Sequence, residues 1–194
     1  MERARELAEM SPVLPELLDF YQQIARFQCS IAEGRAPANL GALLALIGRG
    51  TSDPMHAFFA RVMLQVEAQR TPAADGVEPR CPRCAARPVA AVVRGDDDRR
   101  LLLCGLCFTE WAWGGHGCPN CGEADADQLR SHTDDEFPHI RLEACGTCRV
   151  YLKTIDVTSD ARAVPEVDEL ASVPLDMWAA EQGYTKLQIN LFGM

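Results

Sequence analysis

The spacing of the cysteines is the feature that most constrains how this chain can fold. Eight of its nine cysteines occur in four Cys-x-x-Cys pairs, namely Cys81/Cys84, Cys104/Cys107, Cys118/Cys121 and Cys145/Cys148. A pair of this kind in a tight turn directs two thiolates to one metal ion, and two such turns separated by a hairpin complete a tetrahedral site. The pattern therefore predicts small β modules in which metal ions replace part of an apolar core.

The lengths of the segments between the pairs indicate which pairs share an ion. Nineteen residues separate Cys84 from Cys104, and 23 separate Cys121 from Cys145, which is enough for a hairpin in each case. Only 10 residues separate Cys107 from Cys118. We therefore expect sequential sites, the first two pairs forming one and the last two pairs the other. A cross-braced arrangement, in which the first and third pairs share an ion, is the alternative.

Four thiolates define a closed site for zinc or for a mononuclear iron ion. The run Cys118-Pro-Asn-Cys-Gly resembles a rubredoxin knuckle, but zinc ribbons use the same turn, so both metals stay open. A catalytic zinc keeps one position free for water, whereas four sulfurs leave none. The sequence also contains no hydrolase nucleophile motif, phosphate-binding loop or dinucleotide fingerprint. We therefore expect two bound ions per chain and no enzymatic turnover.

Charge and hydropathy narrow the function classes further. Nineteen basic residues stand against 28 acidic ones among 194, for a net charge of −9. Because nucleic-acid binders usually carry a basic surface, this balance opposes nucleic-acid binding. No apolar stretch approaches the roughly 20 residues that span a bilayer, and the N-terminus lacks the apolar region of a secretory signal. The sequence thus predicts a cytoplasmic protein without membrane insertion, in a compartment that favours metal binding over disulfides.

The chain divides into a helical part and a β part, which predicts an α+β fold. Residues 1–76 form a small helical domain, with helices expected from Leu14 to Ile31, over about 40–47, and from Pro54 to just before Thr71. Residues 71–80 are rich in turn formers and are interpreted as a linker.

Two metal modules of rubredoxin-like or zinc-ribbon type follow. Residues 77–113 form the first, with strands at 89–94 and 101–103, and residues 114–163 form the second, with strands near 129–133, 140–144 and 150–157. Residues 164–194 are predicted to add a short helix after Val173, closed by Gly183, and an apolar tail.

The remaining metal-ligand residue types are assigned ordinary roles. Cys29 is interpreted as a small buried apolar residue. The histidines His116, His132 and His139 lie in the metal segment, but eight cysteines already fill two sites, so surface positions are expected for them. His56 lies near a helix start without an evident partner.

The second cysteine pair begins a stretch with a specific resemblance. Leu103-Cys-Gly-Leu-Cys-Phe-Thr-Glu-Trp111 resembles the Cys-x-x-Cys-x-Thr-Glu-Trp signature of the formate dehydrogenase accessory protein family, FdhE. Cys118-Pro-Asn-Cys-Gly and Glu143-Ala-Cys-Gly-Thr-Cys-Arg-Val-Tyr-Leu-Lys153 are similar to two further knuckles of that family. Val167-Asp-Glu-Leu, Pro174-Leu-Asp-Met-Trp-Ala and Gly183-Tyr resemble its C-terminal segment. The resemblance covers about residues 77–192, and many members carry a longer helical N-terminal region.

The resemblance implies a cytoplasmic maturation factor with rubredoxin-like modules, associated with iron. Such a factor binds the catalytic subunit of a formate dehydrogenase and helps it reach its active form. Glu110 and Trp111 match the signature and are candidates for partner contact or for support, Trp111 being either an interface hot spot or core between the ribbons. Two alternatives compete: a zinc-ribbon adaptor for nucleic acid or protein, and an iron redox carrier.

Overall fold

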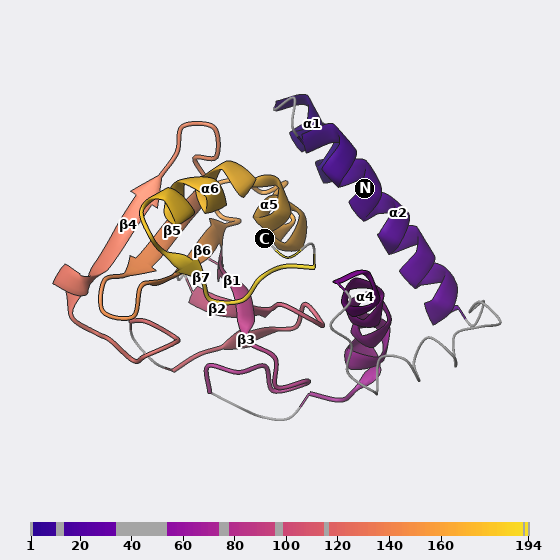
Figure 1. Cartoon of the computed structure of the whole chain (residues 1–194), viewed down its shortest axis with the longest axis horizontal. Helices are drawn as coiled ribbons and strands as arrows, with labels where there is room; N and C mark the ends of the chain where they lie inside the picture. Colours follow the sequence, from indigo (N-terminus) through magenta and orange to yellow (C-terminus); the bar gives the residue numbers. More distant parts are fainter. Residues whose placement is uncertain are drawn as a thin grey trace.

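A computed structural model describes residues 2–10, 14–33, 54–73, 78–95, 99–114, 117–191 and 193. It confirms the predicted α+β class, with helices first, then a sheet that carries two groups of cysteines, then further helices (Figure 1). The helices are α1 Glu2–Met10, α2 Leu14–Ala32, α4 Pro54–Arg70, α5 Pro165–Ala171 and α6 Val173–Glu181. The strands are β1 Pro88–Arg94, β2 Arg99–Cys104, β3 Glu110–Ala112, β4 Leu129–Thr133, β5 Ile140–Cys145, β6 Val150–Asp156 and β7 Thr185–Lys186, and a 3-10 turn, η1, spans Ala126–Gln128.

In the described part of the chain, seven strands form one sheet. Strands β1, β2 and β3 make one antiparallel ribbon, and β4, β5 and β6 make a second. The two ribbons join because β1 pairs in parallel with β6, Ala90 opposite Lys153 and Val93 opposite Asp156, which gives the order β3-β2-β1-β6-β5-β4. The seventh strand, β7, lies off this path and pairs in parallel with the start of β6. The central position of β1 explains its sequence, because a strand buried on both faces is a nearly continuous run of Val and Ala.

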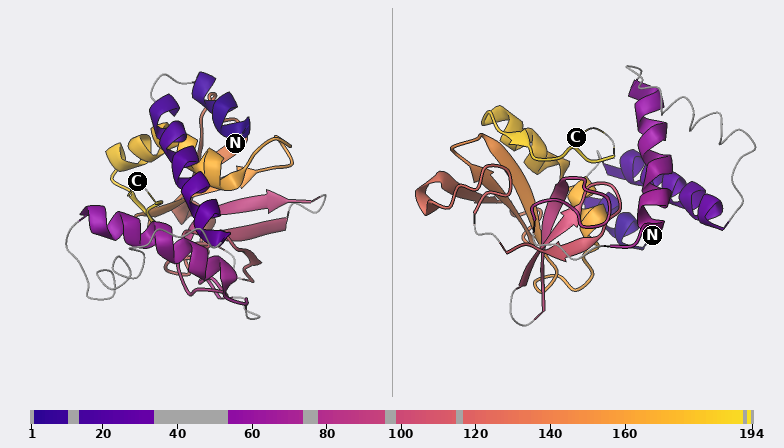
Figure 2. Two further views of the ribbon diagram at one scale, coloured as in Figure 1. Left: turned by 90° about the vertical axis from the view of Figure 1, so that its right-hand side faces the viewer. Right: turned by 90° about the horizontal axis from the view of Figure 1, so that it is seen from below.

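Helices cover one face of this sheet. Residues of α1, α2, α5 and α6 pack with Val92, Leu142 and Ile155 in the larger apolar core, in which Leu7 and Leu18 are fully buried. Figure 2 shows α1 and α2 beside α5, so the N-terminal helices pack against a helix that covers the sheet.

The opposite face of the sheet carries a smaller core beside the first cysteine group. Ala91, Leu102 and Leu152 pack there with Trp111 and with Leu187 of the C-terminal tail. Helix α4 reaches the same core through Ala68 and contacts α2 through Met63, Val66 and Phe27. The tail also contacts α4, since Arg61 donates a hydrogen bond of 3.0 Å to the carbonyl of Ile189.

Several expectations need correction or fall outside the described residues. One C-terminal helix was expected, but two are present, because Pro165 begins α5 as a first-turn proline instead of starting an irregular tail. The predicted helix over 40–47, the turn residues 96–98, the side chain of His56 and the position of His116 lie outside the described residues. The boundaries at 76/77, 113/114 and 163/164 stay predictions, and the sheet crosses the second and the third of them.

Candidate metal centres

The first group of cysteines comes from two turns at the base of the first ribbon. Cys81 and Cys84 precede β1, whereas Cys104 ends β2 and Cys107 follows it. Their four Sγ atoms all lie within 4.8 Å of one another, with separations of 3.5 Å for Cys81–Cys107 and 3.4 Å for Cys84–Cys104.

The second group repeats this construction in the second ribbon. Cys118 and Cys121 precede β4, whereas Cys145 ends β5 and Cys148 leads into β6. Cys118 and Cys148 are separated by 3.6 Å between sulfurs, and Cys121 and Cys145 by 3.7 Å. The thiols are thus grouped in sequential order, and the described residues show no cross-braced grouping.

All four cysteine turns share one backbone conformation. The residue after the second cysteine lies in the left-handed region, with φ of 59° at Ala85, 56° at Phe108, 77° at Gly122 and 57° at Arg149. In three of the turns its amide donates to the carbonyl of the first cysteine, for instance Ala85 to Cys81 at 2.8 Å. This conformation is unfavourable for side chains other than glycine, so three of the four turns store strain that the surrounding structure must offset.

Amide groups inside these turns point to sulfur. The N–H of Arg83 lies 3.4 Å from Cys81 Sγ, and those of Leu106 and Cys107 lie 3.3 and 3.4 Å from Cys104 Sγ. The Cys107 thiol donates to the Thr109 hydroxyl oxygen at 3.1 Å. The amide donors stabilise negative charge on sulfur, as expected for ligands that act as thiolates.

The sulfur geometry fits a tetrahedral metal ion. A tetrahedron with metal–sulfur bonds of 2.3 Å has edges of about 3.8 Å, close to the separations observed in both groups. A disulfide would need about 2.05 Å. Burial raises the pKa of Cys84 to about 11 and that of Cys118 to about 12, so a cation beside these thiols would favour their deprotonation. Zinc and iron both satisfy these requirements.

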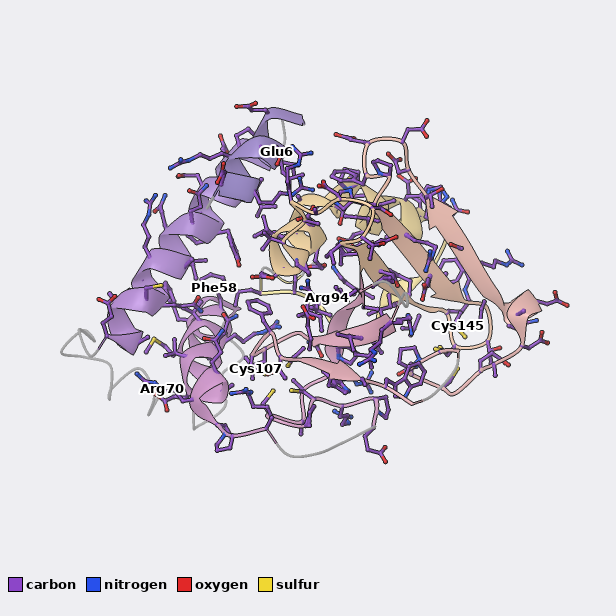
Figure 3. The ribbon with its side chains drawn as sticks, turned by 180° about the vertical axis from the view of Figure 1, so that it is seen from behind. Glu6, Phe58, Arg70, Arg94, Cys107 and Cys145 are labelled. Carbon is purple, nitrogen blue, oxygen red and sulfur yellow. The ribbon has the colours of Figure 1, made fainter. Side chains whose placement is uncertain are left out.

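The two groups differ in their surroundings. In the first group Cys81, Cys104 and Cys107 are buried and Cys84 is half-buried, whereas in the second Cys121 is exposed and Cys148 half-buried. Figure 3 shows Cys107 near α4 and Cys145 in the second ribbon, away from the N-terminal helices.

The residues Glu110 and Trp111 lie on β3 beside the first group. Trp111 is 5% exposed, packs with Cys81, Cys104 and Cys107, and donates through Nε1 to the Glu78 carbonyl at 2.9 Å. This burial fits the supporting role for Trp111 and not direct contact with a partner. Glu110 is half-buried and accepts two hydrogen bonds of 2.7 Å from Arg94.

Three expectations about other side chains were wrong or incomplete. His139 is 7% exposed instead of lying on the surface, because its Nε2 lies 2.7 Å from Asp168 in a buried cluster with Arg3. His132 is half-buried and stacks on Trp178 with 3.7 Å between ring centroids. Cys29, which lies on α2, is exposed and not buried.

A buried ionic cluster was not anticipated from the sequence. Both lysines of the chain, Lys153 and Lys186, lie between the sheet and the C-terminal helices with Glu169 and Asp176. Lys153 donates to Asp176 at 2.8 Å and to the Ser172 hydroxyl at 3.0 Å. Burial lowers the pKa of Lys153, whereas the two ammonium groups lower the pKa of Asp176 against the opposing effect of burial. The one signal for this cluster in the sequence was that the chain contains only two lysines.

Two ribbons that share one sheet, each ending in a group of four cysteines, define a protein with paired rubredoxin-like or zinc-ribbon modules. Comparison with known families agrees. Residues 117–192 match the family model described as "FdhE, C-terminal domain", and residues 80–113 match "FdhE, central domain". Together the two matches cover more than half of the chain, which belongs to the FdhE family.

Individual relatives support this membership. A protein named "Protein FdhE homolog" from Aquifex aeolicus is 36% identical over 116 residues, which cover 58% of this chain and 41% of that protein. A homolog of the same name from Pectobacterium carotovorum is 37% identical over 114 residues, covering 58% and 37%. The chain thus spans about two fifths of the length of the curated relatives it matches. The crystal structure of the FdhE protein from Pseudomonas aeruginosa superposes with a TM-score of 0.65 and 26% identity, covering 98% of this chain and 78% of that one.

Proposed function

We propose that this protein is a formate dehydrogenase accessory protein, which binds the catalytic subunit of the enzyme and helps it reach its active form. The observation that carries the proposal is the pair of four-cysteine groups in the segment that matches the FdhE family. The P. aeruginosa structure adds support because the likeness extends over nearly the whole chain.

Each cysteine group is proposed to hold one ion, iron or zinc, through Cys81, Cys84, Cys104 and Cys107 in the first site and Cys118, Cys121, Cys145 and Cys148 in the second. A bound ion would join the two turns of a ribbon and fix the ends of its strands. Four sulfur ligands leave no open position, so we infer that the chain supports maturation of its partner without turnover of its own.

The partner surface is not expected at the Trp111 side chain, which is buried beside the first group. Glu110 stays a candidate because it is half-buried, although Arg94 occupies its carboxylate. We expect the protein to act in the cytoplasm on an immature dehydrogenase subunit. Among the described helices, none combines the length and apolar character that a bilayer crossing requires.

The test is anaerobic affinity purification of the tagged protein from its native cells, followed by mass spectrometry. A molybdenum- or tungsten-type formate dehydrogenase catalytic subunit should be recovered, and deletion of the accessory gene should lower formate dehydrogenase activity more than subunit abundance. Cys145→Ala should reduce recovery, whereas Cys29→Ala, a cysteine outside both groups, should not. Undiminished formate dehydrogenase activity in the deletion strain, together with no subunit recovered, would refute the proposal.

A further inference from the structure

The second ribbon ends in an edge strand. Strand β4 is the last strand in the sheet order, and in the described part of the chain no other strand pairs with its outer side. Figure 1 shows β4 at the far left of the molecule, and Figure 3 shows it at the far right, opposite α2 and α4 in both views. An edge of this kind offers main-chain hydrogen bonds to an added strand.

The register indicates which main-chain groups face outward. The Gly146 amide donates to the Gln128 carbonyl at 2.7 Å, and Leu129 lies opposite Cys145. Because hydrogen-bonded pairs alternate in an antiparallel ladder, the main-chain groups of Arg130 and His132 point to β5 and those of Ser131 and Thr133 point outward. Ser131 and Thr133 therefore present amides and carbonyls to an incoming strand.

A cavity lies on each side of β4. On the face of the sheet that carries the smaller core, a cavity of about 330 Å³ reaches β4 at Leu129. Val150, Leu152 and Leu187 contribute apolar side chains to this cavity. On the helix-covered face, a more polar cavity of about 180 Å³ is lined by Arg130, His132, Arg149 and Trp178, among others. Alternate side chains of an added strand would enter these two cavities in turn.

Charge differs between the two sides. In the first cavity the guanidinium groups of Arg100 and Arg141 are both paired with Glu143, at 2.7 and 3.0 Å. On the other side Arg130, which also borders the first cavity, is exposed and forms no ion pair or hydrogen bond with another described residue. One side thus combines apolar side chains with two arginines that share one carboxylate, and the other side carries Arg130 and Arg149 without an acidic lining residue, although the whole chain carries −9.

We infer that β4 is a docking edge for an extended segment of a partner polypeptide that alternates apolar and acidic side chains. Its main chain pairs with Ser131 and Thr133, its apolar side chains face Leu129, and its acidic side chains face Arg130. A second copy of this chain fits less well, because edge-to-edge pairing would bring the two arginine-lined sides together. This inference rests on the proposed function in so far as the segment would belong to the dehydrogenase subunit.

The test uses the full chain and a fluorescein-labelled peptide of four Val-Glu repeats, followed by fluorescence anisotropy. The peptide should bind saturably and more weakly at higher salt, and a peptide of four Val-Lys repeats should not bind. Arg130→Glu and Ser131→Pro should each weaken binding about tenfold or more, the first through charge and the second by removing an outward amide. Arg26→Glu, which changes an exposed arginine on α2, is the matched control and should bind normally.

Several outcomes would overturn the inference: no saturable binding of the Val-Glu peptide, equal binding of the Val-Lys peptide, or normal binding by both β4 variants. If Ser131→Pro unfolds, as read by circular dichroism, Arg130→Glu decides alone. A dimer in sedimentation that Ser131→Pro abolishes would assign the edge to a second copy and would also overturn the inference. If the peptide binds but the dehydrogenase subunit is not recovered by affinity purification, β4 is a docking edge and the proposed function is wrong. If wild type and both β4 variants recover the dehydrogenase subunit equally, the proposed function holds and β4 is not the surface that binds the subunit.

Discussion

The two ribbons build their cysteine groups in the same way but surround them differently. In the first ribbon, Trp111 and Ala68 of α4 pack in one apolar core with three of the cysteines. In the second ribbon, Cys121 is exposed and a cavity lies against Cys118 and Cys145. The same cysteine turn therefore occurs in two environments. In the first ribbon its cysteines are part of an apolar core, and in the second ribbon they lie closer to solvent and to the edge strand β4.

The largest difference should appear when a ligand is removed from each ribbon. Structural zinc contributes on the order of 10 kcal/mol of binding free energy to a small unit, and Cys104 is fully buried in the smaller core. Cys104→Ala should therefore make residues 81–107 sensitive to protease. Cys121→Ala should leave these residues protected, because it affects the second group. Limited proteolysis with mass spectrometry measures both, and equal protection of 81–107 in the two variants would contradict the sequential grouping.

Removal of the Trp111 side chain should damage the first ribbon through packing. Truncation of a buried aromatic residue costs about 3–5 kcal/mol, and the Trp111 ring contacts the core that contains Cys104 and Cys107. Trp111→Ala should lower the free energy of unfolding and release metal from the first group. Trp178→Ala is the matched control, since that ring is half-buried and stacks on His132 beside the second ribbon. Chemical denaturation measures the free energy of unfolding, and elemental analysis measures the metal content. If Trp111→Ala keeps the wild-type free energy of unfolding and the wild-type metal content, the ring does not support the first ribbon.

A smaller effect is expected in the rate of metal loss. Because Cys121 is exposed whereas Cys81, Cys104 and Cys107 are buried, a chelator should remove metal in two phases. A tenfold difference in rate corresponds to about 1.4 kcal/mol in the barrier, and we expect at least that separation. Cys121→Ala should lack the fast phase and keep the slow one. A single phase in the wild-type protein, or loss of the slow phase in this variant, would contradict the assignment.

The smallest effect concerns the backbone of the turns. Ala85, in the first ribbon, and Gly122, in the second, occupy equivalent left-handed positions with φ of 59° and 77°. A side chain at such a position costs roughly 1–2 kcal/mol, reduced for Ala85→Gly by the added freedom of the unfolded chain. Ala85→Gly should raise the free energy of unfolding and Gly122→Ala should lower it, as measured by denaturation of metal-loaded protein. Changes of the same sign would show that the two turns are not equivalent.

Much of the local structure could be predicted because local patterns encode it. The cysteine spacing predicted how the thiols are grouped, and alternating or continuous apolar runs predicted strands β1, β2, β4, β5 and β6. The sequence also predicted helices from Leu14 to Ile31 and from Pro54 to just before Thr71, which correspond to α2 and α4. The helix and strand signals depend on neighbours within a few residues of each other, and the grouping of the thiols depends on segments of 10 to 23 residues.

The rest depends on contacts between distant residues. The parallel pairing of β1 with β6 joins segments about 60 residues apart and leaves no local pattern. His139 is buried because Arg3 and Asp168 approach it from other elements, 136 and 29 residues away. The sequence alone also left open whether Trp111 is a contact or core, since an aromatic residue beside a knuckle fits either until the packing of α4 and the sheet is known.

Metal content of the purified protein tests the central claim most directly. Protein prepared without oxygen should contain close to two ions of iron plus zinc per chain by elemental analysis, one for each group of four sulfurs. Cys121→Ala should contain close to one and Cys29→Ala close to two. A wild-type content of one ion or none, in protein whose thiols are shown to be reduced, would contradict the account of two metal centres.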